Sequence, residues 1–304
     1  MDKALRELKD EVEKNFTCKV VFDEPLNNHT TWKIGGPAAL MIEPDSEESL
    51  KHSMAFIKEK ELPWFILGRG SNILVSDKGI KGVVIKLGDK LASLKQEGDL
   101  ISVGAGFSLI KLATIMSKKG YSGLEFAGGI PGSVGGAVFM NAGAHKSDIS
   151  AILTKAYVLM PNGESGWLSN KELKFAYRSS VLQKNGGICI SAEFKLKKGN
   201  TAEIRERLQT NKNYRKETQP WKDPCCGSVF RNPLPEHAGR LIEELGLKGY
   251  KVGGAQVSEK HANFIVNTGE ASAEDILTLI DYIKEQVRIH YGIDLETEVE
   301  HIGD

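Results

Sequence analysis

The spacing of apolar residues along the 304-residue chain predicts helices that alternate with short strands. Leu5, Leu8 and Val12 recur at helical spacing, which indicates an amphipathic helix at the beginning. Further helices are expected over residues 46–62, 108–119, 201–214 and 238–245, and from Ser272 onward. Asp275 follows Ser272 by three positions, so the pair forms a capping box that marks a helix start.

Short apolar runs separated by glycine, serine and aspartate predict the strands. They cover residues 38–44, 64–67, 72–75, 82–87, 100–106, 155–163, 187–196, 263–267 and 295–302. The run 187–196 alternates most regularly, with its apolar residues on one face. These elements divide the chain into three expected domains, 1–87 (with the N-terminal helix), 88–212 and 213–304.

Charge and composition exclude several classes of protein. Lys+Arg and Asp+Glu both number 40, which argues against nucleic acid as a partner, because phosphate binding needs a basic surplus. The longest uncharged apolar run, 128–140, is shorter than the roughly 18 residues of a membrane span. The first 14 residues are charged throughout and the four cysteines lack CxxC spacing, so we expect a cytoplasmic protein. No motif predicts a metal site.

Glycine is concentrated in one part of the chain. Eight of the 32 glycines fall between Gly120 and Gly143, and the core of this stretch is GIPGSVGGAVFMNAGA, residues 129–144. Backbone N–H groups in such a stretch can converge on an anionic diphosphate, because glycine lets a ligand approach the backbone. The stretch is neither a P-loop nor a Rossmann fingerprint. The alternative is a flexible loop with tight turns, but interleaved apolar residues favour a cofactor-binding segment.

A second candidate segment is GRGSN, residues 68–72, directly after the apolar run 64–67. A strand that ends in small, hydrogen-bonding residues is a common place to bind a nucleotide. An ordinary strand turn explains the local pattern equally well.

Six segments in this order carry a resemblance to a known family: IGG, LGRGSNILV, EFAGGIPGSVGGAVFMNAGA, FAYRSS, CGSVFRNP and GGAQVSEKHANFIVN. The sequence resembles the UDP-N-acetylenolpyruvoylglucosamine reductases from about Pro25 to Gly303. The resemblance implies an α+β protein with a two-subdomain FAD-binding fold of the PCMH/vanillyl-alcohol-oxidase type and a C-terminal α+β substrate domain. It also implies non-covalent FAD, NADPH as co-substrate, and a nucleotide-sugar substrate whose enolpyruvyl double bond is reduced for peptidoglycan synthesis.

The family's catalytic residues match three positions. In the implied reaction, hydride passes from flavin N5 to the substrate, and the electron pair left beside a carboxylate must be stabilised and protonated. Arg178 matches the arginine that holds the carboxylate, Ser228 the proton donor, and Glu298 the glutamate that stabilises the enol. Taken singly, Arg178 could be a surface cation, Ser228 a turn residue and Glu298 part of an acidic strand face with Glu296 and Glu300.

The remaining site residues follow from the same motifs. Expected cofactor contacts are Gly68, Arg69, Gly70, Ser71, Asn72, Gly128, Ile130, Pro131, Gly132, Ser133, Gly135, Gly136, Ala137, Asn141 and Gly143. Expected substrate contacts are Tyr177, Arg215, Lys216 and Asn232, although the two cations could equally face solvent. Only VLQKNGG separates FAYRSS from the next strand, which matches the subgroup without a tyrosine-bearing loop there.

Two rival functions remain open at this level. One is a flavoenzyme of the same FAD-binding superfamily that oxidises an alcohol with molecular oxygen, although it would need a base rather than a proton donor. The other is a catalytically silent nucleotide-sugar binding protein. We expect a monomer that acts on a small nucleotide-sugar, without nucleic-acid or membrane partners.

Overall fold

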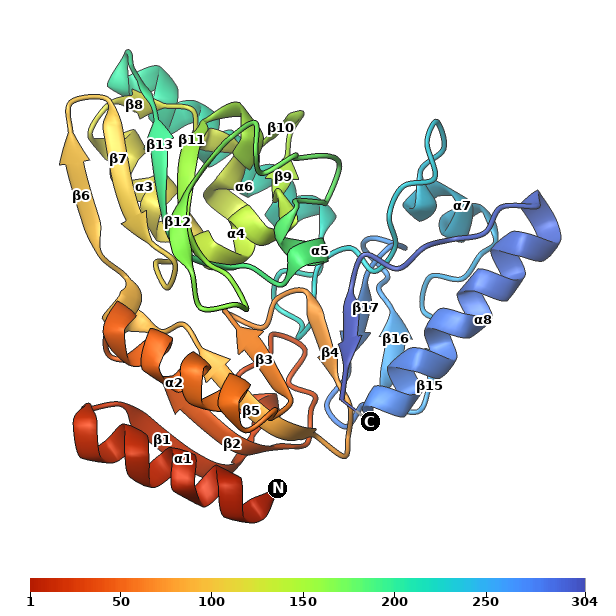
Figure 1. The fold of residues 1–304 in the computed structure, drawn as a ribbon. Helices are drawn as coiled ribbons and strands as arrows, with labels where there is room; N and C mark the ends of the chain where they lie inside the picture. Colours follow the sequence, from red (N-terminus) through yellow and green to blue (C-terminus); the bar gives the residue numbers. More distant parts are fainter. Residues whose placement is uncertain (304) are drawn as a thin grey trace. The chain divides into compact units, whose positions relative to one another are not determined.

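The computed structural model describes residues 1–303 and divides them into two compact units (Figure 1). The first unit comprises residues 1–22, 40–69 and 82–214, and the second comprises 23–39, 70–81 and 215–303. The division is therefore discontinuous in sequence, because two short segments near the beginning belong with the C-terminal part of the chain.

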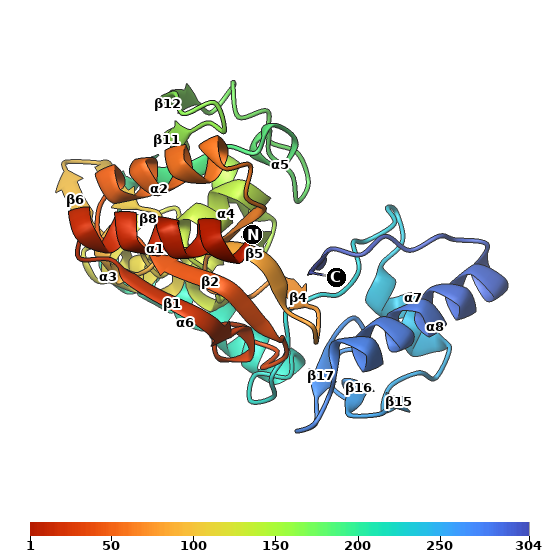
Figure 2. The same ribbon diagram turned by 60° about the horizontal axis from the view of Figure 1, so that its bottom comes forward.

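One layer is a four-stranded sheet in the order β1-β2-β5-β3, most of whose residues belong to the first unit, while the ends of β1, β2 and β5 fall in the residue ranges of the second. The strands are β1 (Lys19–Pro25), β2 (Pro37–Glu43), β3 (Trp64–Leu67) and β5 (Ile80–Lys86), and β3 and β5 are parallel. Helices α1 (Asp2–Asn15) and α2 (Glu47–Glu59) lie side by side in this layer (Figure 2). Leu5, Leu8 and Val12 of α1 are buried, as the periodicity predicts.

The other layer of the first unit is an antiparallel five-stranded sheet in the order β12-β11-β13-β7-β6. The strands are β6 (Leu94–Glu97), β7 (Leu100–Gly104), β11 (Leu153–Leu159), β12 (Ser165–Ser169) and β13 (Ile188–Lys195). Helices α3 (Leu109–Lys118) and α4 (Val134–Met140) share one hydrophobic core with β7, β11 and β13. The apolar face of β13 supplies Ala192 and Phe194 to this core, which confirms the alternation seen in the sequence.

Short elements complete the first unit. They are η2 (Asp89–Leu91), β8 (Tyr121–Ser122), η3 (Glu125–Gly129), β9 (Gly143–Ala144), β10 (Ser147–Asp148), η4 (Ile149–Ala151), α5 (Leu182–Asn185) and β14 (Lys197–Lys198). Helix α6 (Thr201–Thr218) extends four residues beyond the expected end and carries the chain across the boundary between the units at Tyr214.

The second unit has its own hydrophobic core around helix α8 (Ala273–Tyr291), in which Ile276, Ile280 and Ile283 are buried. The predicted capping box is present, since Ser272 and Asp275 exchange hydrogen bonds. Trp32 is fully buried in this core and its Nε1–H donates to the carbonyl of Ile265 at 2.8 Å.

The remaining elements of the second unit are η1 (Leu26–Asn28), β4 (Ile73–Val75), α7 (Ala238–Glu244), β15 (Lys251–Val252), β16 (Ala255–Val257), β17 (Ile265–Asn267) and β18 (Glu300–Ile302). Strands β15, β16 and β17 form one antiparallel sheet, and β18 pairs in parallel with β4. The last strand is shorter than the expected 295–302, because the backbone bends at residues 298–299. Among residues 1–303, no helix has the length and apolar character needed to cross a membrane.

Candidate active site

The glycine-rich stretch contains a helix that the sequence pattern did not predict. Helix α4 begins after Ser133, whose hydroxyl accepts a hydrogen bond from the N–H of Gly136 at 3.3 Å. Glycine is needed at Gly135 because a Cβ there would lie 2.8 Å from the Cβ of Ala105. The glycines of this helix therefore serve close packing as well as any ligand.

Several N–H groups of the stretch are already used inside the first unit. Those of Val134 and Gly135 donate to the carbonyls of Phe107 and Ala105, and that of Gly132 donates to Ile130. Pro131 has no N–H group. The stretch can therefore offer fewer donors to a diphosphate than its glycine content alone implies.

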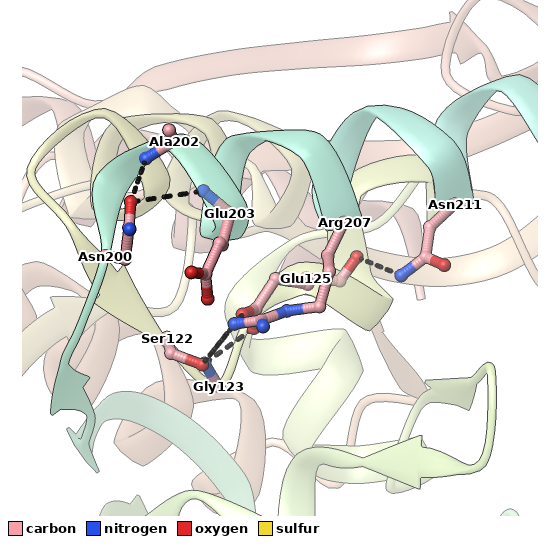
Figure 3. A network of polar contacts seen from close by, with 8 residues as sticks. All are labelled: Ser122, Gly123, Glu125, Asn200, Ala202, Glu203, Arg207 and Asn211. Carbon is pink, nitrogen blue, oxygen red and sulfur yellow. Dashed lines mark hydrogen bonds and ion pairs between the residues drawn. The ribbon is translucent and has the colours of Figure 1, made fainter.

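Glu125, at the start of η3, anchors the entrance to the glycine-rich stretch (Figure 3). Its carboxylate accepts hydrogen bonds from the N–H of Gly123 at 2.6 Å, the hydroxyl of Ser122 at 2.7 Å and the guanidinium of Arg207 at 2.9 Å. Its carbonyl accepts from the side-chain amide of Asn211 at 2.9 Å. Arg207 and Asn211 both belong to α6, so this helix holds η3 in place (Figure 3).

Close packing reinforces the contact between η3 and α6. A Cβ at Gly128 would lie 2.4 Å from Cδ1 of Leu208. Leu208 is 6% exposed and belongs to the core of the first unit. A larger residue at position 128 would therefore require the Leu208 side chain to move.

Arg178 occupies a tight turn in an unusual backbone conformation. Its φ is +52°, in the left-handed region, which few residues other than glycine adopt and which is enriched at functional sites. Ala176 and Ser179 exchange two backbone hydrogen bonds across the turn. The side chain of Gln183 donates to the carbonyl of Arg178 at 3.2 Å, so the turn is fixed from outside as well.

This turn is joined to the end of the glycine-rich stretch. The guanidinium of Arg178 donates to the carbonyl of Gly143 at 2.9 Å and lies 5.0 Å from the ring of Tyr177. Asn141 is buried, and its amide donates to the carbonyl of Ala176 at 3.0 Å. The first unit thus brings Tyr177, Arg178 and the glycine-rich stretch together, and the side chain of Asn141 supports the turn.

The GRGSN segment forms a turn whose backbone is closely packed at Gly70. Gly70 has φ +62°, and a Cβ there would lie 2.2 Å from the carbonyl oxygen of His29, so only glycine fits. Its carbonyl accepts from the N–H of Thr31 at 3.0 Å, which fixes the direction of the loop. Within residues 1–303, the N–H groups of Arg69, Gly70 and Ser71 donate no hydrogen bond. Consecutive unused N–H groups in a turn suit a diphosphate, so the residues present fit a dinucleotide cofactor such as FAD.

The second unit brings Ser228 and Glu298 onto neighbouring segments. The N–H of Glu298 donates to the carbonyl of Val229 at 2.7 Å, and Phe230 forms an isolated β-bridge with Thr297. Ser228 is half-buried and follows Gly227, whose φ of +90° turns the chain. The expected common face of Glu296, Glu298 and Glu300 is not formed, because the bend at 298–299 interrupts the strand.

Two charged residues that the motifs did not single out lie near Glu298. Arg231 has a buried Nε that makes no hydrogen bond within residues 1–303, and its charge acts on the carboxyl of Glu300. Burial raises the pKa of Glu300, and the attraction of Arg231 offsets this only in part. Periodicity could not identify this pair, because the two residues are far apart in the sequence.

The three expected substrate residues of the second unit have different surroundings. Arg215 is half-buried. Burial raises the pKa of the Cys225 thiol, and the positive charge of Arg215 offsets part of this rise. Lys216 is exposed, with its Nζ 5.9 Å from the ring of Trp221. The side-chain oxygen of Asn232 accepts from the N–H of Ala238 at 3.2 Å, so part of this side chain caps α7.

All four cysteines are free, and burial raises the pKa of Cys226, whose thiol also lies near Cys225 and Glu298.

His261 is half-buried, and burial is the largest of the effects that lower its pKa. Its Nδ1 accepts from the N–H of Asn263 at 3.2 Å. No group of three or more metal-binding side chains occurs among the described residues.

Two family models match the chain. The model described as "UDP-N-acetylenolpyruvoylglucosamine reductase, C-terminal domain" matches residues 219–302, and that described as "FAD binding domain" matches residues 38–169. Together they cover both candidate cofactor segments and the segments with Ser228 and Glu298. The predicted α+β fold with an FAD-binding part is confirmed.

Known proteins match over almost the whole length. The UDP-N-acetylenolpyruvoylglucosamine reductase of Halalkalibacterium halodurans is 59% identical over 94% of this chain and 95% of its own length. That of Bacillus subtilis is 55% identical over 100% of this chain and 99% of its own length. The crystal structure of the reductase from Thermus caldophilus superimposes with a TM-score of 0.81 at 38% identity, over 94% of this chain and 99% of that one. This chain therefore belongs to the UDP-N-acetylenolpyruvoylglucosamine reductase family.

Proposed function

We propose that this protein reduces the enolpyruvyl group of UDP-N-acetylglucosamine enolpyruvate to give UDP-N-acetylmuramate for peptidoglycan synthesis, with FAD as cofactor and NADPH as reductant. The observation that carries the proposal is the hydrogen bond between Glu298 and Val229, at 2.7 Å. It holds the candidate acid beside the segment of the candidate proton donor Ser228. The match of both residues to the family's motifs supports the proposal.

The loop 68–72 and the glycine-rich stretch each carry residues that we assign to the cofactor. The chemistry that FAD would supply there is hydride transfer from NADPH to the terminal carbon of the substrate. The unused N–H groups of Arg69, Gly70 and Ser71 would hold its diphosphate. Of the other expected contacts, Asn141 uses its side chain within the protein.

The side chains of the protein would stabilise and protonate the substrate. Arg178 offers a planar guanidinium, which binds a carboxylate in a bidentate manner and offsets the negative charge that grows beside it. Glu298, when protonated, would donate a hydrogen bond to the enolate oxygen. Ser228 would transfer its hydroxyl proton to the carbon next to the carboxylate. A serine hydroxyl is a weak acid, so it must be held close to a strongly basic carbon.

The finer assignments belong to the same proposal. Tyr177, Arg215, Lys216 and Asn232 would contact the nucleotide-sugar, with the two cations near its diphosphate. We propose a monomeric, cytoplasmic enzyme of the subgroup without the tyrosine loop. The four free thiols suit a reducing compartment, and the short helix α5 follows FAYRSS almost directly in the sequence, which supports the subgroup assignment. The three domains would be 1–87, 88–212 and 213–304.

Anaerobic stopped-flow spectroscopy of the purified protein tests the proposal. The protein should be yellow or become yellow with added FAD, and NADPH should bleach the flavin promptly. The enolpyruvyl nucleotide should then restore the colour. A colourless protein that takes up no FAD would favour a silent binding protein, and a flavin that only molecular oxygen reoxidises would favour the oxidase.

A further inference from the structure

Asn72 forms hydrogen bonds to the C-terminal segment with both its side chain and its backbone. Its Nδ2 donates a hydrogen bond to the carbonyl of Glu298 at 3.0 Å. Its own carbonyl accepts from the N–H of Glu300 at 3.1 Å. The second contact starts the parallel ladder of β4 and β18, in which Ile73 lies opposite Glu300.

Glu298 lies where the C-terminal segment stops pairing with one part of the chain and begins to pair with another. Up to Thr297 the segment pairs with residues 229–231, since Thr297 bridges Phe230 and the carbonyl of Glu296 accepts from the N–H of Arg231 at 2.9 Å. From Glu300 onward it pairs with β4. Residues 298–299 form the bend between the two pairings, and their N–H groups both donate to the carbonyl of Val229, at 2.7 and 3.4 Å. The Asn72 amide adds a contact on the carbonyl side of Glu298.

We propose that Asn72 is a positioning residue for Glu298: its amide fixes the bend that aims this acid beside the segment carrying Ser228. The inference rests on the proposed function, because it concerns the acid of that reaction.

The bend matters because a side chain begins where its backbone places it. A rotation at residue 298 moves the whole carboxyl group, and catalytic groups work only within about 0.5 Å of the productive geometry. A misplacement of about 1 Å costs on the order of a hundredfold in rate. The N–H of Glu298 donates to Val229 and its carbonyl accepts from Asn72, so the two peptide groups that flank the Cα of Glu298 are fixed by different partners.

The test compares Asn72→Ala and Asn72→Asp with wild type in the full-length, FAD-loaded protein. The rate at which NADPH bleaches the flavin should stay within about threefold of wild type, because the backbone of the loop is kept. The affinity for FAD should stay within the same range. Reoxidation by the enolpyruvyl nucleotide should slow by about tenfold to a hundredfold in Asn72→Ala. It should slow further in Asn72→Asp, because a carboxylate would face the carbonyl of Glu298.

A measurement without cofactor addresses the geometry directly. Hydrogen–deuterium exchange of the apoprotein should be faster over residues 295–302 in both variants and unchanged over the rest of β4. If Asn72→Ala does not fold, Asn72→Gln, which keeps the amide on a longer side chain, takes its place with the same expected split between the two half-reactions.

Asn267→Ala is the matched control for general destabilisation. Asn267 donates to the carbonyl of Trp32 at 3.0 Å and accepts from the N–H groups of Gly269 and Ala271 at 2.8 and 3.0 Å. Its loss should lower the melting temperature and leave the ratio of the two half-reactions unchanged.

The positioning role would be overturned if Asn72→Ala bound FAD more weakly but, once loaded with FAD, was reoxidised at the normal rate. The side chain would then be a cofactor ligand. Equal slowing of both half-reactions, or of neither, would overturn it as well. A wild-type protein that NADPH cannot reduce would instead refute the proposed function, and that result is read before any variant is compared.

Discussion

Removal of the Glu125 carboxylate should destabilise the first unit far more than removal of its ionic partner Arg207. The side chain of Glu125 is 11% exposed, whereas that of Arg207 is 54% exposed. An ion pair with so exposed an arginine contributes roughly 0–1 kcal/mol. The same carboxylate also accepts from the N–H of Gly123 and the hydroxyl of Ser122, and these half-buried donors would lose their partner.

The magnitude follows from these two bonds. Each donor that loses a charged acceptor costs about 1–3 kcal/mol, and the lower half of this range applies at half-buried sites. Glu125→Ala should therefore cost about 2–4 kcal/mol, and Arg207→Ala less than about 1 kcal/mol. For a unit of this size, 1 kcal/mol shifts the melting temperature by roughly 2–4 °C, so the two variants should be clearly separated.

The pH dependence provides a second test. Burial raises the pKa of Glu125, but the hydrogen bonds from Gly123, Ser122 and Arg207 outweigh it, and the net pKa lies below the ordinary 4.5. A carboxyl with a lowered pKa in the folded state stabilises the fold above its unfolded pKa. This stabilisation is lost as the pH falls through the folded value. Glu125→Gln has no such group, so its stability should fall less on acidification below about pH 4.5.

The assay is thermal unfolding of the apoprotein, followed by calorimetry at pH 7 and at steps down to about pH 3.5. Two results would refute the reasoning. One is an Arg207→Ala variant as unstable as Glu125→Ala, which would mean that the exposed ion pair carries the stability. The other is a Glu125→Gln variant with the acid sensitivity of wild type.

Three further predictions concern other parts of the molecule. In Ser228→Ala, NADPH should still reduce the flavin while substrate reoxidises it several orders of magnitude more slowly; equal slowing of both steps in stopped flow would contradict the proton-donor role. Gly128→Ala should destabilise by about 1–3 kcal/mol, because the new Cβ would lie 2.4 Å from Leu208. Adding Leu208→Ala should relieve part of this, so a double-mutant cycle that shows strict additivity would count against the packing argument. Glu300→Gln should raise the melting temperature near pH 7, since the raised pKa of this half-buried carboxyl means that its ionised form destabilises the fold as pH rises. The gain should vanish below about pH 4, and a gain that is equal at all pH values would contradict it.

The helices and most strands could be predicted because they depend on local periodicity. The stripe of Leu5, Leu8 and Val12 and the capping box at Ser272 each involve residues within a few turns of one helix. Helix α4 was missed because glycine disfavours helices, and its glycines are explained by a partner at Ala105, about 30 positions earlier. A pattern within one segment carries no information about such a distant neighbour.

For the candidate site, too, some features could be predicted from the sequence and others could not. Motif order made Arg178, Ser228 and Glu298 the catalytic candidates, but it did not show which contacts hold each of them. The left-handed backbone of Arg178, the N–H groups already used within the glycine-rich stretch, and the amide of Asn72 on the carbonyl of Glu298 became visible only in the folded chain.

The sequence alone therefore determined the family, the kinds of chemical group available and the elements that arise from short-range spacing. The tertiary structure decided which donors remain for a ligand, and which residues support the reactive ones. It did so because hydrogen bonds such as that between Asn72 and Glu298 join positions more than two hundred residues apart, where neither composition nor periodicity constrains the pairing.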